Sequence, residues 1–226
     1  MKKTNLKKIK LWEAFSRETL DTNINCYDGY LKNFKKHNDR AKMVAWVKEE
    51  SQLKNFKMVS SEISNGDSIL DYGCGVGDFI KYLNENGKKI SGYLGVDINS
   101  NYIDIAKESY PEYDFKTING TEDLSGKFDV VCAIGVFTWF ITKDDFVKTI
   151  NKLVDSANKK VVLTLLYGET PYSYNSPAEV KVNRYWKSTY KKFDKDLFYK
   201  LFPNLEFEFY VDNYTSDGTI VVKIIK

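Results

Sequence analysis

The stretch that decides the fold reads Ile69-Leu70-Asp71-Tyr72-Gly73-Cys74-Gly75-Val76-Gly77-Asp78. Its apolar start indicates a buried strand, and its three alternate glycines let the backbone turn sharply before a helix begins. Asp97 closes a second apolar run, twenty residues after Gly77. Ligands of open α/β sheets bind outside the carboxyl ends of the strands, so a glycine turn and a carboxylate at that edge predict a nucleotide site.

Around this stretch, strand-like and helix-like patterns alternate. Strands are expected over 68–72, 92–98, 113–118, 128–134 and 160–166, with helices over 76–86, 100–110 and 142–156. Two further strand-like runs, 205–212 and 219–225, follow a short helix over 194–202 and predict an antiparallel hairpin. The whole pattern predicts an α/β fold with a doubly wound, mostly parallel seven-stranded sheet and a C-terminal antiparallel hairpin.

Two regions break the alternation. Residues 1–65 have helical periodicity, including one stretch from about Asp39 to Ile63, and are predicted to form an N-terminal helical cap. Residues 66–226 then form the ligand-binding domain, and its segment of about 167–193, with two prolines and seven aromatics, is predicted to be a cap insertion.

Composition restricts the class of protein. The 226 residues carry 34 basic and 31 acidic side chains and are 42% hydrophobic, which suits one elaborated α/β domain. No run approaches the roughly 20 apolar residues of a membrane helix, and the lysine-rich N-terminus lacks the apolar core of a secretion signal. We therefore expect a cytoplasmic protein with no membrane partner. The three cysteines, Cys26, Cys74 and Cys132, have no metal-ligand spacing and predict buried thiols, with no metal site.

The glycine turn is compatible with two nucleotide ligands. A dinucleotide site would have the spacing G-x-G-x-x-G and a pyrophosphate at the helix N-terminus. Here the spacing is G-x-G-x-G, and Asp78 occupies the position of the third glycine, close to where a diphosphate would lie. An adenosyl ligand with a cationic centre and no phosphate avoids that repulsion, so the sequence favours S-adenosylmethionine over NAD.

At these residues the chain resembles the class I S-adenosylmethionine-dependent methyltransferases. Their first motif, an acidic residue followed by G-x-G-x-G, matches Asp71 and the three glycines, and the acidic end of their second strand matches Asp97. Their adenine-contacting segment looks like residues 119–124, and their fourth strand looks like residues 128–134. The resemblance covers about 67–166 well and the closing hairpin by pattern, and it implies a Rossmann-like methyltransferase fold.

The resemblance implies S-adenosyl-L-methionine as cofactor and a site that includes Asp71, Gly73, Gly75, Gly77, Asp97, Ile98, Tyr102, Asn119, Gly120, Thr121, Ile134 and Phe137. One position departs from the family. Many relatives carry an aspartate that bonds the adenine amino group where this chain has Gly120, so Asn119, Thr121 or a backbone carbonyl would have to bond it.

The expected reaction is in-line transfer of a methyl group to an O or N atom of a small-molecule acceptor. Orientation dominates such catalysis, so a base is optional; His37, the single imidazole, and Tyr27, whose ring could face the sulfonium, are the catalytic candidates. His37 could equally be a surface residue, and Tyr27 could pack the helical cap against the sheet.

Other functions stay open. The loop after the fourth strand, 133–137, lacks the D/N-P-P-Y motif of amino-directed nucleic-acid enzymes, and Cys132 lacks the preceding proline of cytosine methylation. Residues 1–66 hold 14 basic and 8 acidic side chains, which leaves an RNA or protein methyltransferase as an alternative. A noncatalytic nucleotide-binding module is the other alternative.

Overall fold

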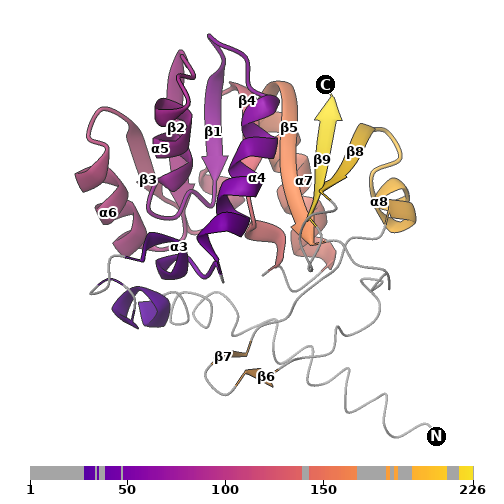
Figure 1. Ribbon diagram of the computed structural model, residues 1–226. Helices are drawn as coiled ribbons and strands as arrows, with labels where there is room; N and C mark the ends of the chain where they lie inside the picture. The colour runs from indigo at the N-terminus through magenta and orange to yellow at the C-terminus, as the bar shows by residue number, and fades with distance from the viewer. Residues whose placement is uncertain are drawn as a thin grey trace, which may run out of the picture.

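The computed structural model describes residues 28–33, 35, 39–46, 48–138, 143–166, 182–183, 186–187, 195–212 and 219–225. Seven strands of this part form one sheet in the order β3-β2-β1-β4-β5-β9-β8 (Figure 1). The strands are β1 Ser68–Tyr72, β2 Gly92–Asp97, β3 Asp114–Thr117, β4 Phe128–Ala133, β5 Ala157–Leu166, β8 Glu206–Asp212 and β9 Thr219–Ile225. β1 to β5 run parallel, and β9 runs antiparallel to both β5 and β8. The predicted fold class is confirmed.

Helices cover both faces of the sheet. The α-helices with both ends described are α3 Arg40–Met43, α4 Glu49–Ser61, α5 Asp78–Glu85, α6 Ser100–Ser109, α7 Lys143–Ser156 and α8 Lys195–Leu201, and all of them except α3 lie on a face. α4, α5 and α6 bury one apolar cluster against the sheet, whereas α7 and α8 bury another. Successive strand residues divide between these clusters, as in Ile69 and Leu70 of β1, because neighbouring side chains of a strand point to opposite faces.

Most predicted elements lie within a few residues of their expected positions. The strand over Ser68–Tyr72 and the strand over Thr219–Ile225 have the bounds that the sequence predicts, whereas β5 begins three residues earlier than expected, at Ala157. Within the predicted insertion, the structure describes only β6 (Val182–Asn183) and β7 (Trp186–Lys187), which pair with each other apart from the seven-stranded sheet.

The predicted helical stretch over 39–63 is two helices with a break between them. Ala45 has a φ of +67°, its N–H donates to the carbonyl of Lys42 at 3.1 Å, and the N–H of Trp46 donates to the carbonyl of Ala41 at 3.0 Å. These bonds form a Schellman motif, which ends α3 with a left-handed residue that is usually glycine. After the break, α4 lies along a face of the sheet, whereas α3 lies at the edge where β1 ends (Figure 1). The boundary at residue 65 stays a prediction.

We expect Gly87→Ala to lower the free energy of unfolding by about 1 kcal/mol, because Gly87 closes α5 in the left-handed region with a φ of +70°. A Cβ on Gly87 would meet no atom within 4 Å, so the backbone alone accounts for the cost. Urea unfolding measures the change. Gly92 has equally open surroundings and no positive φ, so Gly92→Ala is the control. Equal losses in both variants would contradict this explanation.

Candidate cofactor site

The glycine turn after β1 is a place of close approach. Gly73 and Gly75 have φ values of +80° and +55°. A Cβ on Gly73 would lie 2.3 Å from Cγ2 of Val136, and a Cβ on Gly75 would lie 2.8 Å from Cγ1 of Val44. Both positions therefore require glycine, by backbone conformation and by space. The turn is where the N-terminal region and the loop after β4 meet.

Backbone hydrogen bonds fix this turn to the end of β2. The N–H groups of Gly73 and Cys74 both donate to the carbonyl of Val96, at 2.8 and 3.0 Å, and the N–H of Gly77 donates to the carbonyl of Cys74 at 3.1 Å. β1 lies between β2 and β4, the position at which the strand order reverses. The glycine turn is thus at the topological switch point, where open α/β sheets bind ligands.

Asp97 is a buried carboxylate beside the turn. Its Oδ2 accepts the N–H of Gly75 at 3.0 Å, and its Oδ1 accepts the N–H of Asn99 at 2.9 Å. Burial raises the pKa of Asp97 to about 6, although these backbone N–H groups oppose the rise. Each carboxylate oxygen has a further lone pair, so Asp97 has the acceptor capacity that two ribose hydroxyls would require.

Asp71 is a second buried carboxylate, one residue before the end of β1. Its Oδ2 accepts the hydroxyl of Tyr93 at 2.6 Å. Burial raises the pKa of Asp71 to about 7; the Tyr93 bond opposes the rise, and the nearby charge of Asp97 adds to it. Two carboxylates therefore adjoin one glycine turn, and their negative potential favours a cationic ligand over an anionic one.

Asp78 begins α5 and is paired with a cation. Arg40 Nε donates to Asp78 Oδ1 at 2.5 Å, and its Nη2 donates to the carbonyl of Val76 at 2.6 Å. The guanidinium offsets the charge of Asp78, so the repulsion that the sequence predicts for a diphosphate is weaker than expected. The choice between NAD and S-adenosylmethionine therefore depends on the two buried carboxylates, Asp71 and Asp97, and not on Asp78.

The remaining predicted cofactor residues near β2 and β3 are Ile98 and Tyr102, which follow β2, and residues 119–121, which follow β3. Ile98 is half-buried directly after Asp97, whereas Tyr102 is buried and donates its hydroxyl to the carbonyl of Met43. The N–H of Asn119 donates to Asp123 at 2.9 Å. Gly120 is extended, with a φ of 176°, and Thr121 is buried at the start of a 3-10 helix. Tyr102 therefore supports the N-terminal region, and the adenine contacts of 119–121 stay predictions.

The two predicted residues after β4 belong to different apolar clusters. Ile134 is buried with the side chains of α4 and α5. Phe137 is buried with α7, and its ring lies edge-on to that of Phe146, with centroids 5.2 Å apart. Their contact with the cofactor stays a prediction. His37 and Tyr27 lie outside the described residues.

Sequence reasoning missed three residues at this edge. Val44 approaches Gly75, and a Cβ on Gly135 would lie 3.0 Å from Cζ2 of Trp46. Thr164 accepts the N–H of Gly135 at 2.8 Å and so links the ends of β4 and β5. Val44 and Trp46 lie in the helix break, where the sequence has no glycine or proline to indicate it. Thr164 is a polar residue in an apolar strand, and that contrast is the signal that the sequence does carry. Together they cover the carboxyl ends of β1 and β4.

Comparisons with known proteins fit this geometry. A family model described as a methyltransferase domain matches residues 34–195. A protein of Invertebrate iridescent virus 6 that carries the name methyltransferase 235L is 27% identical over 149 residues, which are 66% of this chain and 52% of that protein. The chain thus spans about half the length of this viral relative.

Solved structures share the fold at low identity. The DhpI–SAH complex has a TM-score of 0.66 at 9% identity, covering 92% of this chain and 97% of that chain. Magnesium protoporphyrin IX methyltransferase from Synechocystis PCC 6803, with bound SAM, has a TM-score of 0.55 at 15% identity, covering 78% of this chain and 77% of that chain. The chain belongs to the methyltransferase-domain family, and S-adenosylmethionine is the cofactor of that family.

We expect Asp71 and Asp97 to make the fold less stable as pH rises from about 4 to about 7. The ordinary pKa of an aspartate carboxyl is 3.8, and burial raises the pKa of Asp71 to about 7 and that of Asp97 to about 6, so in this range the folded state binds more protons than the unfolded chain. Each contributes up to about 1.4 kcal/mol per pH unit. Asp71→Asn should remove the contribution of Asp71 to the slope of the free energy of unfolding against pH, as measured by urea unfolding between about pH 4 and about pH 7. The exposed Asp104 provides the control variant Asp104→Asn, and an unchanged slope in Asp71→Asn would contradict the explanation.

We expect Gly73→Ala to lower the free energy of unfolding by about 2–4 kcal/mol, because it combines an alanine in the left-handed region with a clash against Val136. Val136→Ala in the same chain removes the clash and leaves the backbone cost, so the double variant should recover part of the loss. Urea unfolding of the two single variants and the double variant separates the two effects. Additive losses would show that the predicted contact does not form.

Proposed function

We propose that this chain transfers the methyl group of S-adenosylmethionine to an O or N atom of a small-molecule acceptor. The single observation that supports a small acceptor is that two apolar side chains, Val44 and Trp46, lie over the carboxyl ends of β1 and β4. Val44 lies against Gly75 and Trp46 lies against Gly135, so apolar side chains border both turns at which donor and acceptor would meet. Apolar side chains at these two turns suit a small, partly apolar acceptor better than a charged macromolecular one. One structural neighbour is named for a porphyrin-modifying enzyme, which also fits.

In this proposal the residues of the edge bind and orient the donor. Asp97 accepts the two ribose hydroxyls with the lone pairs that Gly75 and Asn99 leave unused. The glycine turn lets the backbone approach the ligand, and Asp71, which accepts the hydroxyl of Tyr93, adds negative potential two residues before the turn. The sulfonium supplies a methyl group that is already activated, so alignment with the acceptor is the main catalytic requirement.

The acceptor is proposed to approach over the ends of β4 and β5. Gly135 and Thr164 join these two ends through a hydrogen bond, and Trp46 provides an aromatic surface beside them. As the acceptor O or N bonded to the methyl carbon, the carbon–sulfur bond would break, the sulfur would keep the electron pair, and the acceptor's proton would pass to water or to a nearby base. His37 and Tyr27 stay proposals for assisting this step.

Among the described segments, no helix has the length and apolar character that crossing a bilayer requires. The cytoplasmic location stays a prediction from the sequence.

We expect wild-type protein to bind S-adenosylmethionine or S-adenosylhomocysteine in calorimetry and Asp97→Asn to bind at least about tenfold more weakly, since hydrogen bonds to a charged group contribute about 1.5–3 kcal/mol each. Asp104→Asn is the matched control, and unfolding of ligand-free protein checks that each variant folds. Absence of binding heat with both ligands in the wild type would overturn the proposal.

The acceptor class is tested by transfer of a labelled methyl group to separated small molecules, RNA and protein. Label in the small-molecule fraction is the expected result. Label confined to RNA or protein would overturn the small-molecule part of the proposal and leave the cofactor part intact.

A further inference from the structure

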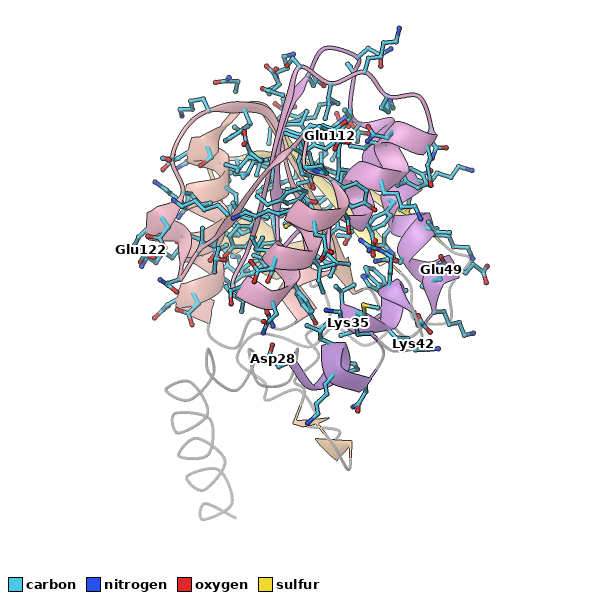
Figure 2. All side chains as sticks on the ribbon, turned by 90° about the vertical axis from the view of Figure 1, so that its left-hand side faces the viewer. Asp28, Lys35, Lys42, Glu49, Glu112 and Glu122 are labelled. Carbon is cyan, nitrogen blue, oxygen red and sulfur yellow. The ribbon has the colours of Figure 1, made fainter. Side chains whose placement is uncertain are left out.

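The N-terminal segment, defined here as the described residues 28–33, 35 and 39–46, bonds to the cofactor edge at three places. Asp28 bonds to the start of α6, Arg40 bonds to the start of α5, and the carbonyl of Met43 accepts the hydroxyl of Tyr102. Figure 2 labels Asp28, Lys35 and Lys42 together at one end of the molecule, and Glu112 at the opposite end. The segment therefore extends across the edge at which the strands β1, β2 and β4 end.

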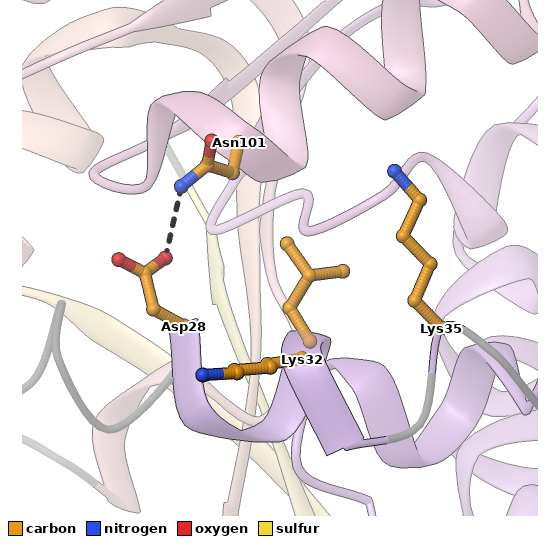
Figure 3. A pocket seen from close by; sticks show the side chains of 5 residues that line it. Asp28, Lys32, Lys35 and Asn101 are labelled. Carbon is orange, nitrogen blue, oxygen red and sulfur yellow. Dashed lines mark hydrogen bonds between the residues drawn. The ribbon is translucent and has the colours of Figure 1, made fainter.

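Asp28 makes the bond nearest to the ribose-binding candidate. Its Oδ1 alone accepts both amide groups, from Asn99 Nδ2 at 2.9 Å and from Asn101 Nδ2 at 3.0 Å. Figure 3 shows the Asp28–Asn101 bond at the side of an open pocket of about 590 Å³, which Leu31, Lys32 and Lys35 also line. Asp28 is thus half-buried and accessible to water at the wall of this pocket.

Asn99 connects this bond to Asp97. Its backbone N–H donates to Asp97 Oδ1 at 2.9 Å, and its side-chain Oδ1 accepts the N–H groups of Asn101 and Tyr102 at 2.9 and 3.3 Å. Asn99 is buried and is the N-cap residue of α6. Asp28 binds Nδ2, the remaining polar atom of the Asn99 side chain, and so fixes the orientation of Asn99. The backbone N–H of Asn99 then holds Asp97 in place.

We propose that Asp28 is a positioning residue of the cofactor site, which acts through Asn99 to hold Asp97 and couples docking of the N-terminal segment to retention of S-adenosylmethionine. This inference rests on the proposed function. Loss of the Asp28 bonds releases the segment and loosens Asp97 at the same time, so the ligand dissociates faster. By linkage, the factor by which docking of the segment raises the equilibrium affinity for the ligand is also the factor by which bound ligand favours docking.

The test measures dissociation of S-adenosylhomocysteine from the full chain. Asp28→Ala removes two hydrogen bonds and should raise the dissociation rate about tenfold. Asp28→Asn keeps an oxygen that can accept both amides, because one oxygen already accepts both, and should restore the rate to within about threefold of wild type. Lys32→Ala, a change in the same segment and pocket wall without a bond to α6 among the described contacts, is the matched control and should leave the rate unchanged.

A second variant and a second readout separate positioning from general stability. Asn101 is exposed, and Asn101→Ala removes one of the two bonds with little risk to folding; it should raise the rate about threefold. Hydrogen exchange of the α3 amides should slow when S-adenosylhomocysteine binds wild type, and this protection should be lost in Asp28→Ala. A structural role alone would change unfolding and leave the ligand-dependent protection intact.

The outcomes distinguish the two proposals. A wild type that does not bind S-adenosylhomocysteine overturns the proposed function. A wild type that binds it, with equal dissociation rates in Asp28→Ala and wild type, overturns the positioning role alone. An equal acceleration in Lys32→Ala also overturns it, because the effect would then not depend on the bonds to Asn99 and Asn101.

Discussion

The carboxylate of Asp97 is the constraint on which the ligand edge depends. A carboxylate that is largely removed from water is stable only when protein groups satisfy its oxygens, and here the N–H groups of Gly75 and Asn99 do so. These two donors belong to the turn after β1 and to the cap of α6. One buried charge therefore sets the relative positions of three elements, and the left-handed glycines are what allow the turn to reach it.

The same arrangement is electrostatically unfavourable without a cation. Asp71 and Asp97 are both buried, and the pKa of each is raised, to about 7 and about 6. A positively charged sulfur nearby would lower both pKa values, so ligand binding and ionisation of the pair would favour each other. Perturbed titration of this kind is common at functional sites, where structure is arranged for a ligand at the expense of stability.

The sheet and its ligand edge could be predicted because their signals are local. Apolar runs mark β1, β2, β4 and the second half of β5, glycines mark the turn after Tyr72, and Gly87 marks the end of α5. The docking of the N-terminal segment could not be predicted in this way. Ala45 ends α3 in the left-handed region, a position that glycine usually occupies, so the sequence contains no glycine to mark this end of the helix.

Long-range contacts account for the other misses. Asp28 and Asn99 are 71 positions apart and meet only once the sheet has formed. Likewise, the sequence gives no sign that the hydroxyl of Tyr102 bonds to the carbonyl of Met43, 59 positions away, and its predicted contact with the cofactor stays a prediction. Burial and partners of this kind depend on tertiary packing, which no periodicity reports.

The position of β9 affects the order in which this chain can fold. β9 follows β8 in the sequence but lies between β5 and β8 in the sheet, pairing along seven residues with each. β8 has no other strand beside it in the described sheet, so it has nothing to pair with until β9 has emerged. The first five strands could assemble progressively during synthesis on the ribosome, whereas the last two would have to join as a pair. This non-local step favours a late, slow phase of folding.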